Sequence, residues 1–170
     1  MKSTWKFRTG FIIILFSIAM IPYITIPSVA VIDNGFNTQN YPVVAFVDDA
    51  FYADLDGLGN TFDIQFNVSV HVLDFEEAYY YSGFHVLLRA GLELPSGAIY
   101  WYDLDIIAYK PDFKIVLQFY NYCLESGIYT AHILASTLGS EEIFGHLRVF
   151  DPPGGVGGAP PSFKAFLCLV

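Results

Sequence analysis

The stretch FDIQFNVSVHV, residues 62–72, decides the fold class. Apolar side chains occupy every second position, and polar side chains fill the positions between them. Because successive side chains of an extended strand point to opposite faces of a sheet, this pattern predicts a strand with one buried and one solvated face. The apolar set is Phe62, Ile64, Phe66, Val68, Val70 and Val72, and the polar set is Asp63, Gln65, Asn67, Ser69 and His71.

The same period of two recurs on both sides of this stretch. A first strand is expected near residues 43–52, and the other alternating runs cover residues 84–90, 100–109, 113–120, 129–136 and 143–149. Nothing between these runs has the 3.6-residue period of an amphipathic helix. Seven short strands in about 110 residues predict an all-β fold, a seven-stranded antiparallel sandwich of two sheets.

Two segments carry a family resemblance. SGIYTAHILAS, residues 126–136, resembles the sixth strand of immunoglobulin-like and fibronectin-III-like surface domains, which begins with Gly-x-Tyr and has Ala six positions after the Tyr. EEIFGHLRVFDPP, residues 141–153, is similar to their closing strand. The resemblance implies a prokaryotic-style exported immunoglobulin-like sandwich over residues 43–150, with Tyr129 filling the corner between the sheets. No cysteine lies on the second or sixth strand, so the antibody-type disulfide is absent.

The N-terminus predicts export. Three basic residues within the first eight positions precede a charge-free apolar run over residues 11–32, and small residues lie at Ser28 and Ala30. This is the pattern of a signal peptide over residues 1–30, and a retained membrane-anchor helix is the alternative. Both place the body outside the cytoplasm, secreted or at the cell surface. Residues 31–42 are then a linker, and a membrane is contacted only through an uncleaved N-terminal segment.

Composition excludes some function classes. The chain of 170 residues has a net charge of −9, and without the leader it has five Lys and Arg against 17 Asp and Glu, a net charge of −12. A surface of this sign repels phosphate backbones, so nucleic-acid binding is excluded. The sequence contains none of the common catalytic signatures, such as GxSxG, HExxH or a P-loop, so no enzymatic activity is expected.

One motif predicts a metal site. DLDGLGNTFD, residues 54–63, resembles the Asp- and Gly-rich calcium loops of exported repeat proteins and EF-hand-like segments. The expected ligands are Asp54, Asp56, Asn60 and Asp63, because Ca²⁺ prefers carboxylate and carbonyl oxygens. Leu58 occupies a position where such loops usually have a ligand. A polar turn without an ion is the alternative, and no other cofactor is expected.

A second candidate site is a sheet face. The alternation assigns every histidine to an outward position, and it turns Ile143, Gly145, Leu147 and Val149 inward. If the third, sixth and seventh strands share one sheet, a positively charged outer face is expected for an anionic ligand, an acidic partner or a transition metal. Its members would be His85, Arg89, His132, His146 and Arg148. Solvated polar residues without a ligand are the alternative.

Aromatic side chains at outward positions form a third pattern. They are expected to contact proteins or to stack on sugars. The set comprises Tyr79, Tyr80, Tyr81, Trp101, Tyr109, Tyr120 and Phe144. Asn67, within Asn-Val-Ser, is a candidate glycosylation site at an outward strand position.

The C-terminal region leaves two questions open. Residues 151–162 form a Pro- and Gly-rich spacer, and residues 163–170 form an apolar tail. The tail either packs on its own sandwich or pairs with the open sheet edge of a neighbouring subunit. Cys123 and Cys168 either form a disulfide or remain free.

The sequence thus predicts a non-enzymatic exported module, structural or adhesive, that works at the surface through contacts with other surface proteins or with its own copies. Stabilisation by calcium is a further expectation. The alternative is a module that binds a ligand or glycan through the exposed aromatics and the face with His and Arg residues.

Overall fold

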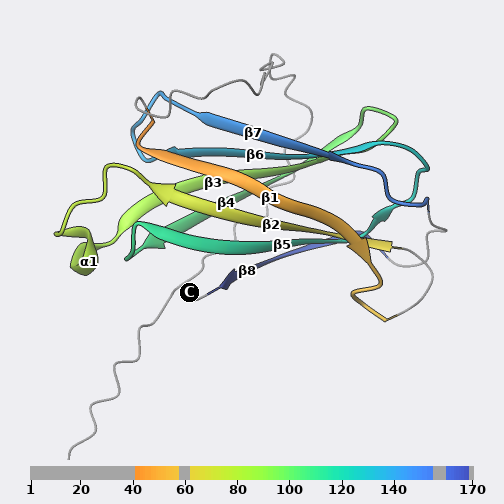
Figure 1. Cartoon of the computed structure of the whole chain (residues 1–170), viewed down its shortest axis with the longest axis horizontal. Coiled ribbons are helices and arrows are strands. Elements are labelled where there is room, and N and C mark those ends of the chain that lie inside the picture. Colours follow the sequence, from red (N-terminus) through yellow and green to blue (C-terminus); the bar gives the residue numbers. More distant parts are fainter. Residues whose placement is uncertain (1–40, 58–61, 155–159, 169–170) are drawn as a thin grey trace, which may run out of the picture.

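The computed structural model describes residues 41–57, 62–154 and 160–168, and its strands form two four-stranded antiparallel sheets (Figure 1). One sheet has the order β1-β2-β5-β8 and the other has the order β4-β3-β6-β7. One short helix, α1 (Tyr79–Ser82), lies between β2 and β3. The strands are β1 (Val43–Ala53), β2 (Phe62–Val72), β3 (Phe84–Glu93), β4 (Ile99–Ala108), β5 (Asp112–Cys123), β6 (Tyr129–Thr137), β7 (Phe144–Phe150) and β8 (Ser162–Cys168).

The predicted alternation places the core between the two sheets. In β2 the apolar side chains from Ile64 to Val72 are buried, and the same holds for the alternate apolar positions of β3 and β6. Inward side chains from both sheets make one hydrophobic cluster. Burial of apolar area is the main stabilising contribution to such a fold. The all-β expectation is therefore confirmed, with two antiparallel sheets in a sandwich arrangement.

The expected number of seven strands is wrong, because the C-terminal tail adds an eighth. Strand β8 pairs with β5 of its own chain, in register from Lys114 opposite Cys168 to Tyr120 opposite Ser162. The ring of Phe163 stacks on Tyr102 of β4, with 4.1 Å between the ring centroids. The tail therefore packs on its own sandwich. Its partner strand lies about 50 residues earlier in the chain, and a local pattern cannot reveal such a pairing.

Because neighbouring strands are antiparallel, the connections between strands lie at two opposite ends of the sandwich. The β2–β3, β4–β5 and β6–β7 connections lie at the end that carries α1, which we call the α1 end (Figure 1). Strand β1 also begins there, since Val43 pairs with Val72. The β1–β2, β3–β4 and β5–β6 connections lie at the opposite end.

The predicted leader, residues 1–30, and most of the predicted linker, residues 31–42, lie outside the described residues. Within the described part of the chain, no helix has the length and apolar character needed to cross a membrane.

Candidate functional site

Three carboxylates predicted as calcium ligands come together at the opposite end of the sandwich. Asp54 and Asp56 follow β1, and Asp63 lies at the start of β2. One carboxylate oxygen from each lies within 4.8 Å of the other two. Asn60, the fourth predicted ligand, lies outside the described residues. The structure thus brings together the three aspartates of the predicted set.

Asp63 organises this loop through its carboxylate, which is fully buried. Its Oδ2 accepts hydrogen bonds from the backbone N–H groups of Leu55 and Asp56, at 2.9 and 3.0 Å. Its Oδ1 accepts one from the backbone N–H of Asn121, at 2.8 Å. The alternation assigned Asp63 to the solvated face, so its burial is a correction. The cause is an irregularity in the β2–β5 pairing, which resumes at Ile64 only after skipping residues on β5.

Asn121 is a member of this cluster that the sequence did not reveal. It lies within the irregular part of β5 and has a φ of 61°. Asn tolerates this left-handed conformation better than most residues. Its side chain is 4% exposed, and the Nδ2 atom lies 3.5 Å from Asp56 Oδ2. Its Oδ1 is buried and accepts no hydrogen bond from any described residue. An Asn 58 positions after Asp63 gives no motif that a sequence reader could recognise.

The outer face of the second sheet carries three of the five predicted His and Arg residues, and each has a carboxylate partner. Arg89 donates two hydrogen bonds to Asp103, at 2.5 and 3.0 Å, and this hydrogen bonding raises the pKa of the guanidinium. His85 lies 3.3 Å from Asp105, and His132 lies 2.8 Å from Glu93. Arg89 and both histidines are therefore paired with carboxylates, which disfavours an anionic ligand there.

A shared transition metal is disfavoured on this face by distance. His132 lies beside Gly91, which is six residues from His85 along β3. At about 3.3 Å per residue the two histidines are about 20 Å apart. No other group of three or more His, Cys, Asp or Glu residues within the described ranges is arranged to hold a metal ion, apart from the aspartate cluster.

His146 and Arg148 do not lie on that outer face, and the prediction for them is wrong. They pair with Ile133 and Ala131, which point into the core. His146 Nδ1 accepts a hydrogen bond from the Val47 N–H at 3.1 Å, and Arg148 donates to the Asp48 carbonyl and pairs with Asp49 at 3.3 Å. Both side chains thus contact β1 at its bulge. The inversion arose because apolar residues occupy both alternating sets of β7, so the pattern does not fix which set faces inward.

Asn67 lies on the outer face of β2, as predicted. It is half-buried in the middle of the sheet, between β1 and β5. Its Oδ1 accepts a hydrogen bond from Gln65 Nε2 at 3.0 Å. Whether Asn67 carries a glycan stays a prediction.

Among the predicted outward aromatics, Tyr80, Tyr81 and Tyr109 are exposed, Tyr79 and Trp101 are half-buried, and Tyr120 and Phe144 are buried. Tyr120 does lie on the outer face, where its hydroxyl donates to Gln118 and Lys164 covers its ring. The outward assignment is wrong for Phe144, which belongs to the core. The exposed ones lie at the α1 end, where the other connections also carry exposed apolar side chains. Together the exposed apolar set of the α1 end is Leu73, Tyr80, Tyr81, Tyr109, Leu138 and Ile143.

The two cysteines are free. Cys168 pairs with Lys114, nine residues from Cys123 along β5, so the two thiols are about 30 Å apart. A disulfide needs Cα atoms within about 7 Å, so this fold leaves them unpaired. Burial raises the pKa of the Cys123 thiol to about 11. Such a thiol is unreactive at neutral pH.

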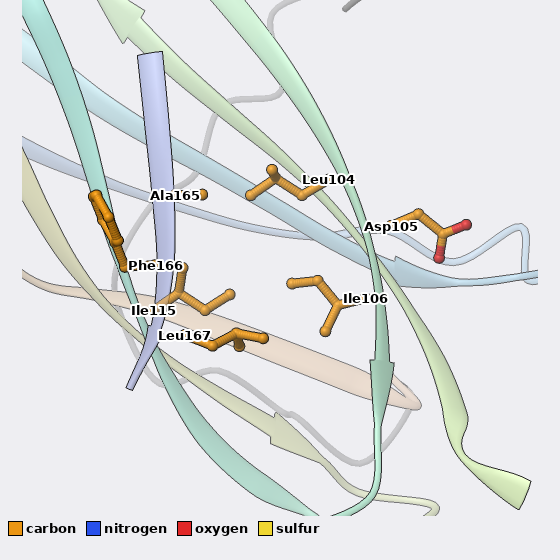
Figure 2. A pocket seen from close by; sticks show the side chains of 7 residues that line it. All are labelled: Leu104, Asp105, Ile106, Ile115, Ala165, Phe166 and Leu167. Atoms are coloured by element: carbon orange, nitrogen blue, oxygen red, sulfur yellow. The ribbon is translucent and has the colours of Figure 1, made fainter. Parts of the chain in front are cut away.

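A first surface hollow offers little room for a small ligand. It lies between β4, β5 and β8 (Figure 2), and its volume of about 10 Å³ is near the lower limit for one water molecule. Its lining is Leu104, Asp105, Ile106, Ile115, Ala165, Phe166 and Leu167.

A second hollow, of about 280 Å³, opens beside Ser69, His71 and Asp112. His71 Nδ1 lies 2.7 Å from Asp112 Oδ1, but the Ser69 hydroxyl donates to Asp48. Since a hydroxyl has a single proton, Ser69 lacks the bond to His71 that would activate it as a nucleophile.

Comparisons with known proteins found no match. No family model, no curated protein and no solved structure matches the chain. Two features of the described residues are candidates for function. One is the α1 end, which carries the two most exposed large apolar side chains, Tyr81 and Leu138. The other is the aspartate cluster at the opposite end, which also carries exposed apolar side chains, namely Tyr52, Ile99, Tyr100, Leu124 and Ile128.

Proposed function

We propose that this chain is an exported, non-enzymatic module with an immunoglobulin-like sandwich, and that it works at the cell surface through protein–protein contacts made by its α1 end. The partner is another surface protein or a second copy of the chain. The single observation that carries this proposal is that, among the described residues, the two most exposed large apolar side chains, Tyr81 at 87% and Leu138 at 70%, both lie on connections at the α1 end.

The strand order supports the immunoglobulin-like assignment. If β1 to β7 are lettered A, B, C, C′, E, F and G, the sheets read A-B-E and C′-C-F-G, which keeps the C-F-G neighbours of the immunoglobulin fold together. Tyr129, near the start of β6, supports it further. Its hydroxyl accepts a hydrogen bond from the Glu125 N–H and donates one to the Glu125 carbonyl, the geometry of a tyrosine corner.

The α1 end has the properties of a contact surface. Its apolar side chains are well exposed, and the Tyr81 side chain, at 87%, is the extreme case. In antibody variable domains the B–C, C′–C″ and F–G loops at one end of the sandwich form the binding surface. The β2–β3, β4–β5 and β6–β7 connections are at comparable places. Grouped exposed apolar residues commonly mark interaction sites, and tyrosine is enriched at interfaces.

The N-terminal segment supports the compartment. Its basic start and long apolar run are typical of a signal or anchor, and both lead to the outside of the cytoplasm. The acidic body, with a net charge of −12 without the leader, would not be attracted to anionic lipid headgroups. Contact with a protein partner agrees with this balance.

The test is a pair of triple variants of the full chain, each studied on the cells that make it. The first replaces Tyr80, Tyr81 and Leu138 with Ser at the α1 end, and the control replaces Tyr100, Leu124 and Ile128 with Ser at the opposite end. All six side chains are exposed, so both variants should fold. Thermal unfolding of both purified variants checks that point.

We expect the native complex, measured by its size after gentle extraction, to be lost in the first variant and kept in the control. Equal complexes in both variants would contradict the proposal. A monomer that instead gives saturable binding on a glycan array, lost in the α1-end variant, would replace it with the glycan-binding alternative.

A further inference from the structure

We propose that Asp54, Asp56, Asp63 and Asn121 form a calcium site, with the Asn121 amide oxygen as its neutral ligand. The site lies at the opposite end of the sandwich from the proposed contact surface. It does not rest on the proposed function, and either proposal can fail without the other.

The spacing of the carboxylates fits one ion. Oxygen ligands lie about 2.4 Å from Ca²⁺, so two ligands of the same ion are at most about 4.8 Å apart. One oxygen from each of the three aspartates meets this limit. Ca²⁺ accepts six to eight oxygens in loose geometry, so the remaining positions can be filled by water at the exposed Asp54 side.

Two of the three carboxylates have no cationic partner in the described part of the chain. Asp54 and Asp63 make no ion pair with any Lys, Arg or His of the described ranges. Asp63 is fully buried, and a buried carboxylate is costly unless it is paired or bound to a metal. Its three backbone hydrogen bonds offset part of that cost, and a divalent cation would offset the repulsion among the three carboxylates.

Asn121 supplies the independent observation. Asn121 is 4% exposed and its amide group reaches Asp56 of the cluster. Its buried Oδ1 nevertheless accepts no hydrogen bond from any described residue. Buried polar atoms nearly always have a partner. The Asn121 Nδ2, bonded to the same carbon as Oδ1, lies 3.5 Å from Asp56 Oδ2, so Oδ1 also lies beside the cluster. A Ca²⁺ ion held by the three aspartates would give Oδ1 the partner that it lacks.

The first part of the loop, residues 54–56, is held in place by Asp63. Asp63 Oδ2 accepts the N–H groups of both Leu55 and Asp56, which fixes the chain between the first two ligands. Among the described residues, Asp63 Oδ1 accepts one hydrogen bond, from the Asn121 N–H, and its second lone pair can bind the ion. With three charged ligands and an open side, we expect the affinity of an extracellular module, a Kd of about 10⁻⁴–10⁻³ M.

The first experiment is calorimetric titration of the purified full chain with CaCl₂. We expect one saturable site with a Kd in that range, and a melting temperature that rises with Ca²⁺. D54N should weaken binding at least tenfold without changing the melting temperature in chelator, because Asp54 is exposed. D74N is the matched control: Asp74 is an exposed aspartate at the α1 end, and its loss should leave the affinity unchanged.

The second experiment tests Asn121 with two variants. N121G removes the ligand but suits a positive φ, so it should fold and bind Ca²⁺ about tenfold more weakly. N121D adds a fourth carboxylate, so it should unfold at a lower temperature in chelator and bind Ca²⁺ more tightly than the wild type. If the Asn121 amide has a structural role only, N121D should lose stability in chelator without binding Ca²⁺ more tightly.

Three results would overturn the proposal. The first is the absence of heat and of any shift in melting temperature at about 10 mM Ca²⁺. The second is an equal weakening of Ca²⁺ binding by D54N and D74N, because binding would then come from diffuse electrostatic attraction and not from a site. The third is unchanged affinity in both N121G and N121D, because Asn121 would then not be a ligand.

Discussion

Removing the Tyr129 hydroxyl tests the corner that joins β5 to β6. Tyr129 is fully buried, and its hydroxyl makes two hydrogen bonds with Glu125, at 3.0 Å from the N–H and 2.9 Å to the carbonyl. The Glu125 carboxylate in turn accepts two hydrogen bonds from Ser96, both at 2.8 Å. The Tyr129 hydroxyl therefore holds a backbone segment that is itself tied to the β3–β4 connection.

Tyr129→Phe keeps the ring in the core and deletes only these two bonds. Each contributes about 0.5–1.5 kcal/mol, so the free energy of unfolding should fall by about 2 kcal/mol. For a body of this size, about 4 °C per kcal/mol corresponds to a melting temperature lower by about 8 °C. The buried apolar area is unchanged, so the dependence of the unfolding free energy on denaturant should keep its slope.

Urea unfolding followed by Tyr fluorescence and circular dichroism measures both quantities. Tyr109→Phe is the control, since Tyr109 is exposed and its hydroxyl should contribute less than about 0.5 kcal/mol. A loss below about 0.5 kcal/mol for Tyr129→Phe, equal to that of the control, would refute the role assigned to the corner.

Four further predictions concern Gly91, Cys123 and β8. Gly91→Ala should displace the Trp101 ring, since a Cβ there would lie 2.5 Å from it, and the Trp101 emission should shift to the red. Cys123 should resist iodoacetamide at pH 8 while the partly exposed Cys168 reacts, which mass spectrometry of the labelled peptides can show. Burial raises the Cys123 pKa from 9.0 to about 11, because the fold favours the neutral thiol. The contribution of this thiol to the free energy of unfolding should therefore persist below pH 9 and be lost between pH 9 and 11. Urea unfolding midpoints measured across this range should fall in the wild type, and Cys123→Ala should remove this part of the fall. Deleting β8 should expose the edge of β5 and cause self-association by light scattering, whereas a mass that stays monomeric would contradict the pairing.

The interior strands could be read from the sequence because one alternating set was clearly apolar. In β2 and β6 the inward positions are Phe, Ile, Val, Ala or Tyr, and the outward ones are mostly polar. In the edge strand β7 both alternating sets are apolar, because Phe144 and Phe150 belong to one set and Leu147 and Val149 belong to the other. The register with β6 decides in favour of Phe144, which is 1% exposed, whereas Val149 is 55% exposed.

The candidate sites were predictable only where ligands are close in the sequence. Asp54, Asp56 and Asp63 lie in one short segment, and their clustering was foreseen. Asn121 joins them through the irregular β2–β5 pairing, a tertiary feature that local spacing does not encode. The apolar α1 end was not predictable either. Tyr81 and Leu138 are far apart in the sequence, and they lie at the same end because the strand order brings their connections there.

The central claim is that the α1 end meets a protein partner, and site-specific photo-crosslinking on intact producing cells tests it most directly. A photoreactive phenylalanine analogue at Tyr81 should give one discrete protein adduct, while the same analogue at Leu124, exposed at the opposite end, should give none. Failure to form an adduct at Tyr81, or the same adducts from both positions, would contradict the account.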